Sequence, residues 1–192
     1  VLSTRPDLLP ENLVNELKKL QEDVPPIPFS DVKKEIEETL GMPIGEAFVE
    51  FDEAPLASAS IGQVHKARLK LADESIVDVA VKVQRPNIRQ TVERDLDLLY
   101  LMARLIERTI PESSIYSPSG LVAEFDRAIT AELDYTIEAK NAERFAKNFA
   151  ENPSVRFPKV YGHVSGKKVH VAEFFHGLHI DQALAAGYPG PL

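Results

Sequence analysis

The sequence contains no cysteine among its 192 residues. Without thiols the chain can form neither a disulfide framework nor a thiolate metal site, which fits a reducing compartment. It also lacks any run of about 18 apolar residues and any stretch that resembles a signal peptide, so the chain as given contains no membrane-spanning helix. It has no internal repeat and no low-complexity segment. We therefore expect a cytoplasmic protein that can associate with a membrane when complete.

A dense basic stretch is also missing. The 22 Lys and Arg residues are outnumbered by 30 Asp and Glu residues, which gives a net charge of -8. Nucleic acid is therefore not an expected partner. The five histidines show no metal-ligand spacing, and we expect them to be surface or strand residues. An apolar content of 44% with 27% charged residues is ordinary for a globular protein with one sizeable core or two small ones.

Residues 76–84 form the central motif, a strand pattern that contains one lysine. Four valines at alternate positions predict a strand with one face in a core: Val77, Val79, Val81 and Val83. Lys82 then points to the other face. A cation on a half-buried sheet face needs an anion, either a carboxylate of the protein or a bound phosphate. The alternative is an ordinary exposed strand lysine.

A segment of small residues, Ala57-Ser58-Ala59-Ser60, precedes this strand. Small side chains let a ligand approach the backbone N–H groups, as in phosphate-binding loops, although they are also common in simple hairpin turns. A strand over Gln63–Leu71 and a turn at 72–75 follow. The order of small-residue loop, strand, hairpin and lysine-bearing strand is that of a protein-kinase N-lobe, which covers ATP phosphates in this way.

Helical patterns flank this hairpin. Near the N-terminus we predict helices over 10–21 and Asp31–Leu40, the second capped by Ser30 and ended by Gly41. Residues 44–51 are ambiguous between helix and strand. A long helix should run from Pro86 to Thr109, with an apolar arc so wide that we expect burial on more than one side. Ser119 should cap the next helical region.

An acidic motif lies within that last region. Asp134, Glu138 and Asn141 share one helical face, whereas Glu132 and Asp134 would point about 200 degrees apart on an unbroken helix. We therefore predict a helix break near Thr130, which would act as an N-cap. On the residues alone, a solvated acidic face with i,i+4 ion pairs is the favoured interpretation of the motif. Further on, residues 157–164 and 167–174 predict a hairpin around Ser165-Gly166, and 180–186 a short helix.

Several long motifs, in order along nearly the whole chain, resemble the UbiB-type atypical kinase family, also called AarF-domain kinases. They are residues 3–10 (STRPDLLP), 55–65 (PLASASIGQVH), 79–86 (VAVKVQRP) and 132–141 (ELDYTIEAKN). The resemblance implies that Ala57–Ser60 replaces the glycine-rich loop and that Glu132-x-Asp134 is an acidic active-site motif. It also implies that Lys82 pairs with Glu138, with Glu132 as second choice.

The same resemblance implies a nucleotide site. The backbone of Glu173 and Phe175 would form the hinge that meets the adenine edge of ATP or ADP, with Mg²⁺ in the complete protein. The family's Lys-x-Gly-Gln motif and a kinase C-lobe with its catalytic loop and metal-binding Asp do not occur in this sequence. We therefore expect a segment of a larger protein that is catalytically incomplete and whose partner is its own C-lobe.

The expected fold class is α+β: a kinase-like N-lobe with an antiparallel sheet of about five strands and extra helices. We expect a helical extension over residues 1–43 and the N-lobe over 44–192, with a helical insertion at about 86–118. The expected function is ATP binding within a kinase-like ATPase that supports ubiquinone or isoprenoid-lipid metabolism. The alternatives are a non-catalytic kinase-like module that docks a protein or membrane partner, and a plain helical adaptor.

Overall fold

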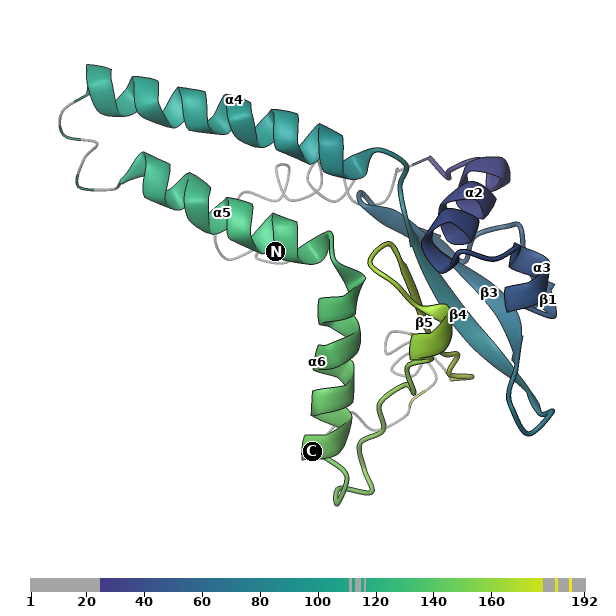
Figure 1. Cartoon of the computed structure of the whole chain (residues 1–192). Helices are drawn as coiled ribbons and strands as arrows, with labels where there is room; N and C mark the ends of the chain where they lie inside the picture. Colours follow the sequence, from purple (N-terminus) through teal and green to yellow (C-terminus); the bar gives the residue numbers. More distant parts are fainter. Residues whose placement is uncertain are drawn as a thin grey trace.

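The computed structural model describes residues 25–110, 112, 115, 117–177, 182 and 187. The helix expected over 10–21 lies outside the described residues, and so does the one over 180–186 apart from Gln182. The described chain is a small sheet with helices around it and a long two-helix arm that extends to one side (Figure 1). Within this part of the chain, no helix combines the length and apolar character needed to cross a membrane.

The sheet has five antiparallel strands, as the sequence predicts. They are β1 (Glu50–Phe51), β2 (Ala57–Ser58), β3 (Gly62–Lys70), β4 (Ile76–Gln84) and β5 (Val169–Glu173). Strand β3 pairs with β1, β2 and β4, and β4 pairs with β5. In this register Lys82 lies between Val64 of β3 and His170 of β5. The mixed α+β fold class is therefore confirmed.

One face of the sheet forms the core. Val79, Val81 and Val83 are completely buried, as their alternation predicts, and they pack with Val32 and Ile36 of helix α2 (Phe29–Leu40). Because successive strand residues point to opposite faces, the same register places Lys82 on the face away from α2. The helix that we assigned to an N-terminal extension thus contributes to the core of the sheet, while the boundary at 43/44 stays a prediction.

The local starts of the first helices differ from the sequence prediction. Helix α2 begins at Phe29 with Pro28 as its N-cap residue, so Ser30 lies inside the first turn and does not cap. The Pro28 carbonyl accepts the first regular helical hydrogen bond from the Val32 N–H and a second bond from the Asp31 N–H, which is one of the free donors of that turn. Gly41 ends the helix in the left-handed region, as predicted. The ambiguous segment after it contains a helix, α3 (Ile44–Ala47), followed by strand β1.

The predicted second hairpin forms only in part. Its second strand is β5, but its first strand is reduced to one bridge at Val160, followed by the 3₁₀ helix η3 (Gly162–Val164). The Ser165 hydroxyl explains the difference, because it accepts from the Val171 N–H and donates to the Tyr161 carbonyl. A side chain here occupies backbone groups that a regular ladder would pair, which favours a turn over a strand.

The arm consists of α4 (Ile88–Thr109) and α5 (Pro118–Glu132), which run side by side, and α6 (Tyr135–Asn148) then turns back along the sheet (Figure 1). Helix α4 starts two residues later than predicted, after Asn87 in the left-handed region. Ser117, not Ser119, is the N-cap residue of α5. Both the N–H and the hydroxyl of Ser119 donate to Glu107, which ties the two helices together.

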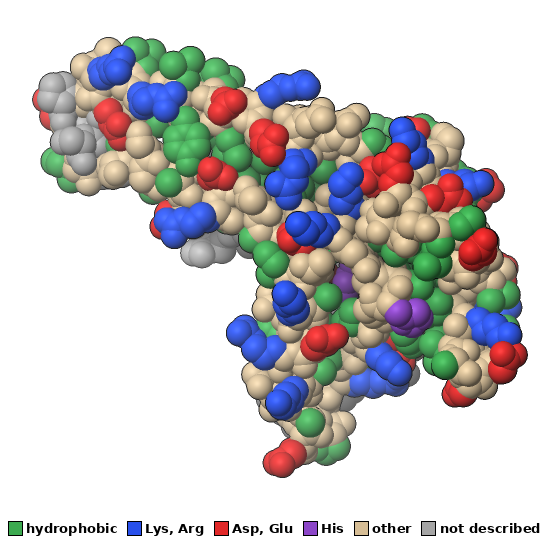
Figure 2. Space-filling view, in the orientation of Figure 1, with side chains coloured by type: hydrophobic (Ala, Val, Ile, Leu, Met, Phe, Trp, Pro, Cys, Tyr) green, Lys and Arg blue, Asp and Glu red, His purple; other side chains and the backbone are tan. Residues whose placement is uncertain are grey.

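The predicted burial of the α4 apolar arc on more than one side is wrong for the part of the chain that the structure describes. Only Leu96 and Ala103 of α4 are buried, and large apolar side chains of both arm helices are exposed: Leu98, Leu99, Leu101, Met102, Leu105, Ile106, Leu121 and Phe125. In the space-filling view, hydrophobic side chains lie open along the arm between charges of both signs (Figure 2). The arm extends beyond the sheet, so the sheet cannot cover it.

Candidate functional site

The candidate site is centred on Lys82 and Glu138, which come from β4 and α6. The Lys82 Nζ lies 2.6 Å from Glu138 Oε2 and donates a hydrogen bond to it. The Lys82 side chain is 29% exposed and the Glu138 side chain 46% exposed, so the pair is open to solvent on one side. The predicted pairing is thus present in the structure, and it joins the sheet to the helix that carries the acidic motif. A short charge-assisted contact of this kind fixes the direction of the ammonium.

A buried aromatic ring completes the surroundings of Lys82. The Lys82 Nζ lies 4.6 Å from the ring centroid of Tyr135, the first residue of α6. In such a cation–π contact the ring face attracts the ammonium and helps to position it. Burial raises the pKa of the Tyr135 hydroxyl, with a further contribution from Glu138 and then Glu132, so the phenol stays neutral. Burial lowers the pKa of His170, the strand neighbour of Lys82. The nearby Glu138 carboxylate partly offsets this lowering, and the Lys82 ammonium adds to it.

The helix break that the acidic motif requires exists, but not where we predicted it. Helix α5 continues through Thr130 to Glu132, and the chain restarts as α6 at Tyr135 with Asp134 as N-cap. The Asp134 carboxylate accepts hydrogen bonds from the Thr136 N–H at 3.0 Å and from its hydroxyl at 2.6 Å. Thr130 instead donates to Asp126 one turn back. The break lets Glu132 and Asp134 line one cavity, which an unbroken helix would prevent.

Asp134→Ala should lower the free energy of unfolding by about 1 kcal/mol at neutral pH, because a lost N-cap costs that much. Hydrogen bonds from Thr136 hold the pKa of Asp134 below its usual range. The stabilisation should therefore be present above about pH 4, the unfolded-state pKa, and disappear as the pH falls through the lower folded-state pKa. Chemical denaturation of both proteins at several pH values measures this difference.

Asp134→Asn is the matched variant, because asparagine caps helices as well as aspartate but does not titrate. It should keep most of the stability at neutral pH and lose the dependence on acid. If Asp134→Ala unfolds like the unmodified chain at neutral pH, the capping role is wrong.

A cavity of about 470 Å³ lies beside the ion pair. Besides Lys82 and the Tyr135 ring, the polar side chains that line it are Glu132, Asp134, Glu138 and Asn141. One cation thus faces three carboxylates, so an incoming phosphate would meet Lys82 as its attractive group. Among the described residues, no group of three or more His, Asp or Glu side chains is arranged to hold a metal ion.

The small-residue segment is a tight hairpin at the end of the sheet that leads to Lys82. Ala57 pairs with Val64 and Ser58 with Gln63, and the Ala59 N–H donates to the Gly62 carbonyl at 2.8 Å. A Cβ on Gly62 would lie 2.5 Å from the backbone oxygen of Val83 and 2.7 Å from the Tyr135 hydroxyl. The glycine therefore allows the hairpin to approach both β4 and the ring under Lys82. Since Val64 is the register neighbour of Lys82, the segment and the lysine lie at the same end of the sheet.

The two predicted hinge residues lie at the end of β5. Glu173 ends the strand, and its carboxylate pairs with Arg156 and accepts from the Lys159 N–H. Phe175 is 41% exposed, and the guanidinium of Arg156 lies 4.8 Å from its ring centroid. Both line a separate cavity of about 460 Å³, which Arg156 also lines. Contact of their backbone with an adenine stays a prediction.

Sequence reasoning missed several residues around the site. Tyr135 and His170 carry the two buried side-chain polar atoms, the hydroxyl and Nδ1, that have no hydrogen-bond partner among the described residues. Tyr135 lies inside the acidic motif and could have been singled out as a large aromatic residue next to an N-cap. His170 could be found only from strand register, which the sequence pattern does not fix. The roles of Gln63 and Arg85 were not predicted either, although the two residues lie in the motifs at 55–65 and 79–86.

Comparison with known proteins agrees with this geometry. Residues 19–187 match the ABC1 atypical kinase-like domain. Proteins named probable protein kinase UbiB from Pseudomonas aeruginosa and Azotobacter vinelandii are 42% and 41% identical over 180 and 185 residues, or 94% and 96% of this chain. These alignments cover 33% and 34% of the relatives, so the chain spans about a third of their length.

A solved structure shows the same fold. The structure of Rv3197 from Mycobacterium tuberculosis in complex with erythromycin superimposes with a TM-score of 0.73 at 31% sequence identity, and covers 97% of this chain and 46% of that one. The antiparallel sheet, the lysine–glutamate pair and the match over residues 19–187 lead to one conclusion. This chain belongs to the ABC1 atypical kinase-like domain family.

Proposed function

We propose that this chain binds ATP or ADP as the nucleotide-binding part of a UbiB-type atypical kinase or ATPase. The observation that carries the proposal is the ion pair of 2.6 Å between Lys82 and Glu138, on the sheet face away from the core and beside the small-residue hairpin. A lysine on the third long strand of a kinase sheet, held by a helix glutamate, is the arrangement that orients nucleotide phosphates in protein kinases.

Each site residue has a role in this proposal. Lys82 donates to the phosphates, Glu138 fixes its direction, and Ala57–Ser60 cover the phosphates with backbone close to the ligand. In the complete protein Mg²⁺ would neutralise phosphate charge, and Glu132 and Asp134 would shape the site. The backbone of Glu173 and Phe175 would meet the adenine edge. As the resemblance to the UbiB-type family implies, the complete protein would support ubiquinone or isoprenoid-lipid metabolism.

Titration of the chain with ATP or ADP in the presence of Mg²⁺ tests the proposal. Calorimetry should show saturable binding with one site per chain. Inorganic triphosphate at the same ionic strength is the control, because it carries the phosphate charge without the base and should bind more weakly. The net charge of -8 disfavours non-specific attraction of anions. Absence of saturable binding by both nucleotides would overturn the proposed function.

A second candidate function rests on the exposed arm. The apolar side chains of α4 and α5 that remain open to solvent are typical of a surface that docks a partner, so a non-catalytic kinase-like module is the alternative. The nucleotide-binding function depends on the residues around Lys82, whereas the docking function depends on the exposed apolar residues of the arm. If nucleotide does not bind while polar substitutions at Leu101 and Leu105 abolish function in the cell, the docking module is the correct description.

A further inference from the structure

A buried side-chain amide connects the small-residue hairpin at Ala57–Ser60 to the segment before α2. Gln63 of β3 is 1% exposed. Its Oε1 accepts a hydrogen bond from the Ile27 N–H at 2.8 Å, and its Nε2 donates to the Ile27 carbonyl at 3.4 Å. One side chain thus pairs with both backbone groups of a residue 36 positions earlier, in the way that a neighbouring strand would.

The same amide also contacts the hairpin and a buried histidine. Oε1 accepts a second bond from the Ser58 hydroxyl at 3.3 Å, and Nε2 lies 2.8 Å from Nε2 of His65. The other ring nitrogen of His65 lies 2.8 Å from the Asp52 carbonyl, which can only accept. His65 therefore carries its proton on Nδ1 and accepts from Gln63 through Nε2. Both donors and both acceptor positions of the amide are used, so its orientation is fixed.

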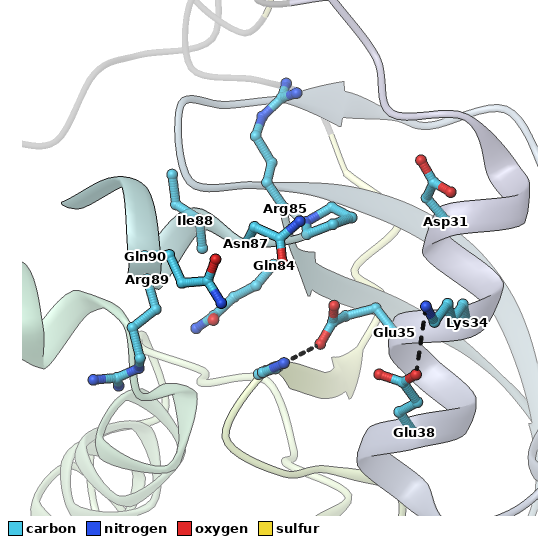
Figure 3. A pocket seen from close by; sticks show the side chains of 12 residues that line it. Asp31, Lys34, Glu35, Glu38, Gln84, Arg85, Asn87, Ile88, Arg89 and Gln90 are labelled. Carbon is cyan, nitrogen blue, oxygen red and sulfur yellow. Dashed lines mark hydrogen bonds and ion pairs between the residues drawn. The ribbon is translucent and has the colours of Figure 1, made fainter. Parts of the chain in front are cut away.

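Arg85 makes a second, independent link between the same two segments. Its Nε donates to the Ala59 carbonyl at 3.0 Å and its Nη2 to the Pro25 carbonyl at 2.8 Å. Its own N–H donates to the Ile61 carbonyl at 2.9 Å. A cavity of about 410 Å³ lies between α2 and the start of α4, where Glu35 pairs with Lys168 (Figure 3). The Arg85 side chain extends away from Glu35 and Lys34 in this view.

We propose that Gln63 and Arg85 are positioning residues. They couple residues 25–28, the connector that precedes α2, to the small-residue hairpin at Ala57–Ser60. Displacement of the connector would then change nucleotide affinity. This inference rests on the proposed function for its effect on affinity, and on the contacts above for the link itself. Neither residue needs to touch the nucleotide.

The connector is well suited to transmit a displacement. Pro25, Pro26 and Pro28 restrict its backbone to extended conformations, so movement at one end is not absorbed by local bending. Its other end begins α2, which is packed into the core. A stiff segment that is hydrogen-bonded to one hairpin at two points can shift that hairpin between two positions. Because such coupling is reciprocal, nucleotide binding must then shift the connector by the same coupling free energy.

Arg85→Lys and Gln63→Leu test the coupling by amide hydrogen exchange and nucleotide titration. Arg85→Lys keeps the charge but cannot reach both carbonyls as a fork. It should speed exchange at the Ala59 N–H, and also at the Ile27 N–H, which Arg85 does not contact. A lost hydrogen bond of ordinary strength corresponds to about a three- to tenfold change in exchange rate and in the Kd for MgADP.

Arg89→Lys is the matched control, because Arg89 lines the same cavity and pairs with Glu93. This substitution should leave unchanged both the exchange rates at Ala59 and Ile27 and the Kd for MgADP. MgADP should slow exchange at Ile27 in the unmodified chain and in Arg89→Lys, and this response should be absent in Gln63→Leu. If Gln63→Leu does not fold, Arg85→Lys, whose side chain is partly exposed, decides alone.

The outcomes separate the two proposals. Unchanged exchange at Ile27 in Arg85→Lys, or nucleotide binding that leaves the Ile27 N–H unaffected in the unmodified chain, overturns the coupling while the proposed function stands. Failure of the unmodified chain to bind nucleotide overturns the proposed function. In that case, faster exchange at both Ile27 and Ala59 in Arg85→Lys still supports the link between the connector and the hairpin.

Discussion

Lys82→Ala should weaken the binding of MgATP or MgADP by about tenfold to a hundredfold. The reason is the loss of a charge-assisted hydrogen bond to phosphate, which contributes about 1.5–3 kcal/mol when the donor is ionised. Among the described residues that line the cavity beside Lys82, the other charged side chains are carboxylates, so none of them can replace the ammonium. Calorimetric titration of the variant and the unmodified chain measures the change in Kd.

The loss should affect binding far more than folding. Lys82 and Glu138 both keep solvent contact, and ion pairs of this kind contribute about 1 kcal/mol or less to stability. Removal of the lysine also takes away its contact with the Tyr135 ring, but the valine face of β4, which forms the core, is unchanged. The midpoint of thermal unfolding should therefore shift by only a few degrees, about what 1 kcal/mol produces in a domain of this size.

Lys70→Ala is the matched control. Lys70 lies at the end of β3 and forms an ion pair of 2.6 Å with Glu74 in the exposed β3–β4 turn. The two substitutions change net charge equally, so any general effect of charge on anion binding is the same in both. If Lys82→Ala binds nucleotide as tightly as Lys70→Ala does, Lys82 has no part in the site.

Glu138→Gln should also weaken nucleotide binding, by about tenfold. Simple electrostatics predicts the opposite sign, because removal of a carboxylate from an acidic cavity should attract phosphate. Positioning predicts weaker binding, because the Lys82 ammonium loses the partner that fixes its direction at 2.6 Å. The sign of the change in Kd therefore distinguishes whether Glu138 holds Lys82 or merely repels the ligand.

A double-mutant cycle makes this prediction sharper. If Glu138 acts through Lys82, the variant with both Lys82→Ala and Glu138→Gln should bind no more weakly than Lys82→Ala alone. Glu143→Gln, on the same helix but outside the cavity, makes the same change in charge and should leave Kd unchanged. Additive losses in the double variant would show that Glu138 acts independently of the lysine.

The sequence predicted those features that depend on local periodicity. Alternation of valines placed Lys82 on the sheet face opposite the core, because strand side chains point to opposite faces in turn. Helical spacing placed Asp134, Glu138 and Asn141 on one face, and the structure brings all three to the cavity beside Lys82. Strands β3, β4 and β5 were likewise predictable from alternating segments separated by turns, whereas β2 lies in the segment predicted as a small-residue loop.

Choices between competing local signals were not predictable. Thr130 and Asp134 can both cap a helix, and the structure uses Asp134, whose carboxylate accepts two hydrogen bonds from Thr136. Ser165 replaces part of a strand ladder through its hydroxyl. In each case the alternatives differ by about one hydrogen bond, about 1 kcal/mol, which surrounding contacts easily outweigh.

Long-range placement required the tertiary structure. The sequence determined that Lys82 needs an anion, and the resemblance to a family suggested Glu138. Only the packing of α6 against the sheet, with Tyr135 buried at its start, brings the carboxylate within 2.6 Å across 56 residues of chain. The links from Gln63 and Arg85 to Ile27 and Pro25 have no periodic signature at all. Periodicity records which face of an element is buried, whereas which elements meet depends on how those faces pack together.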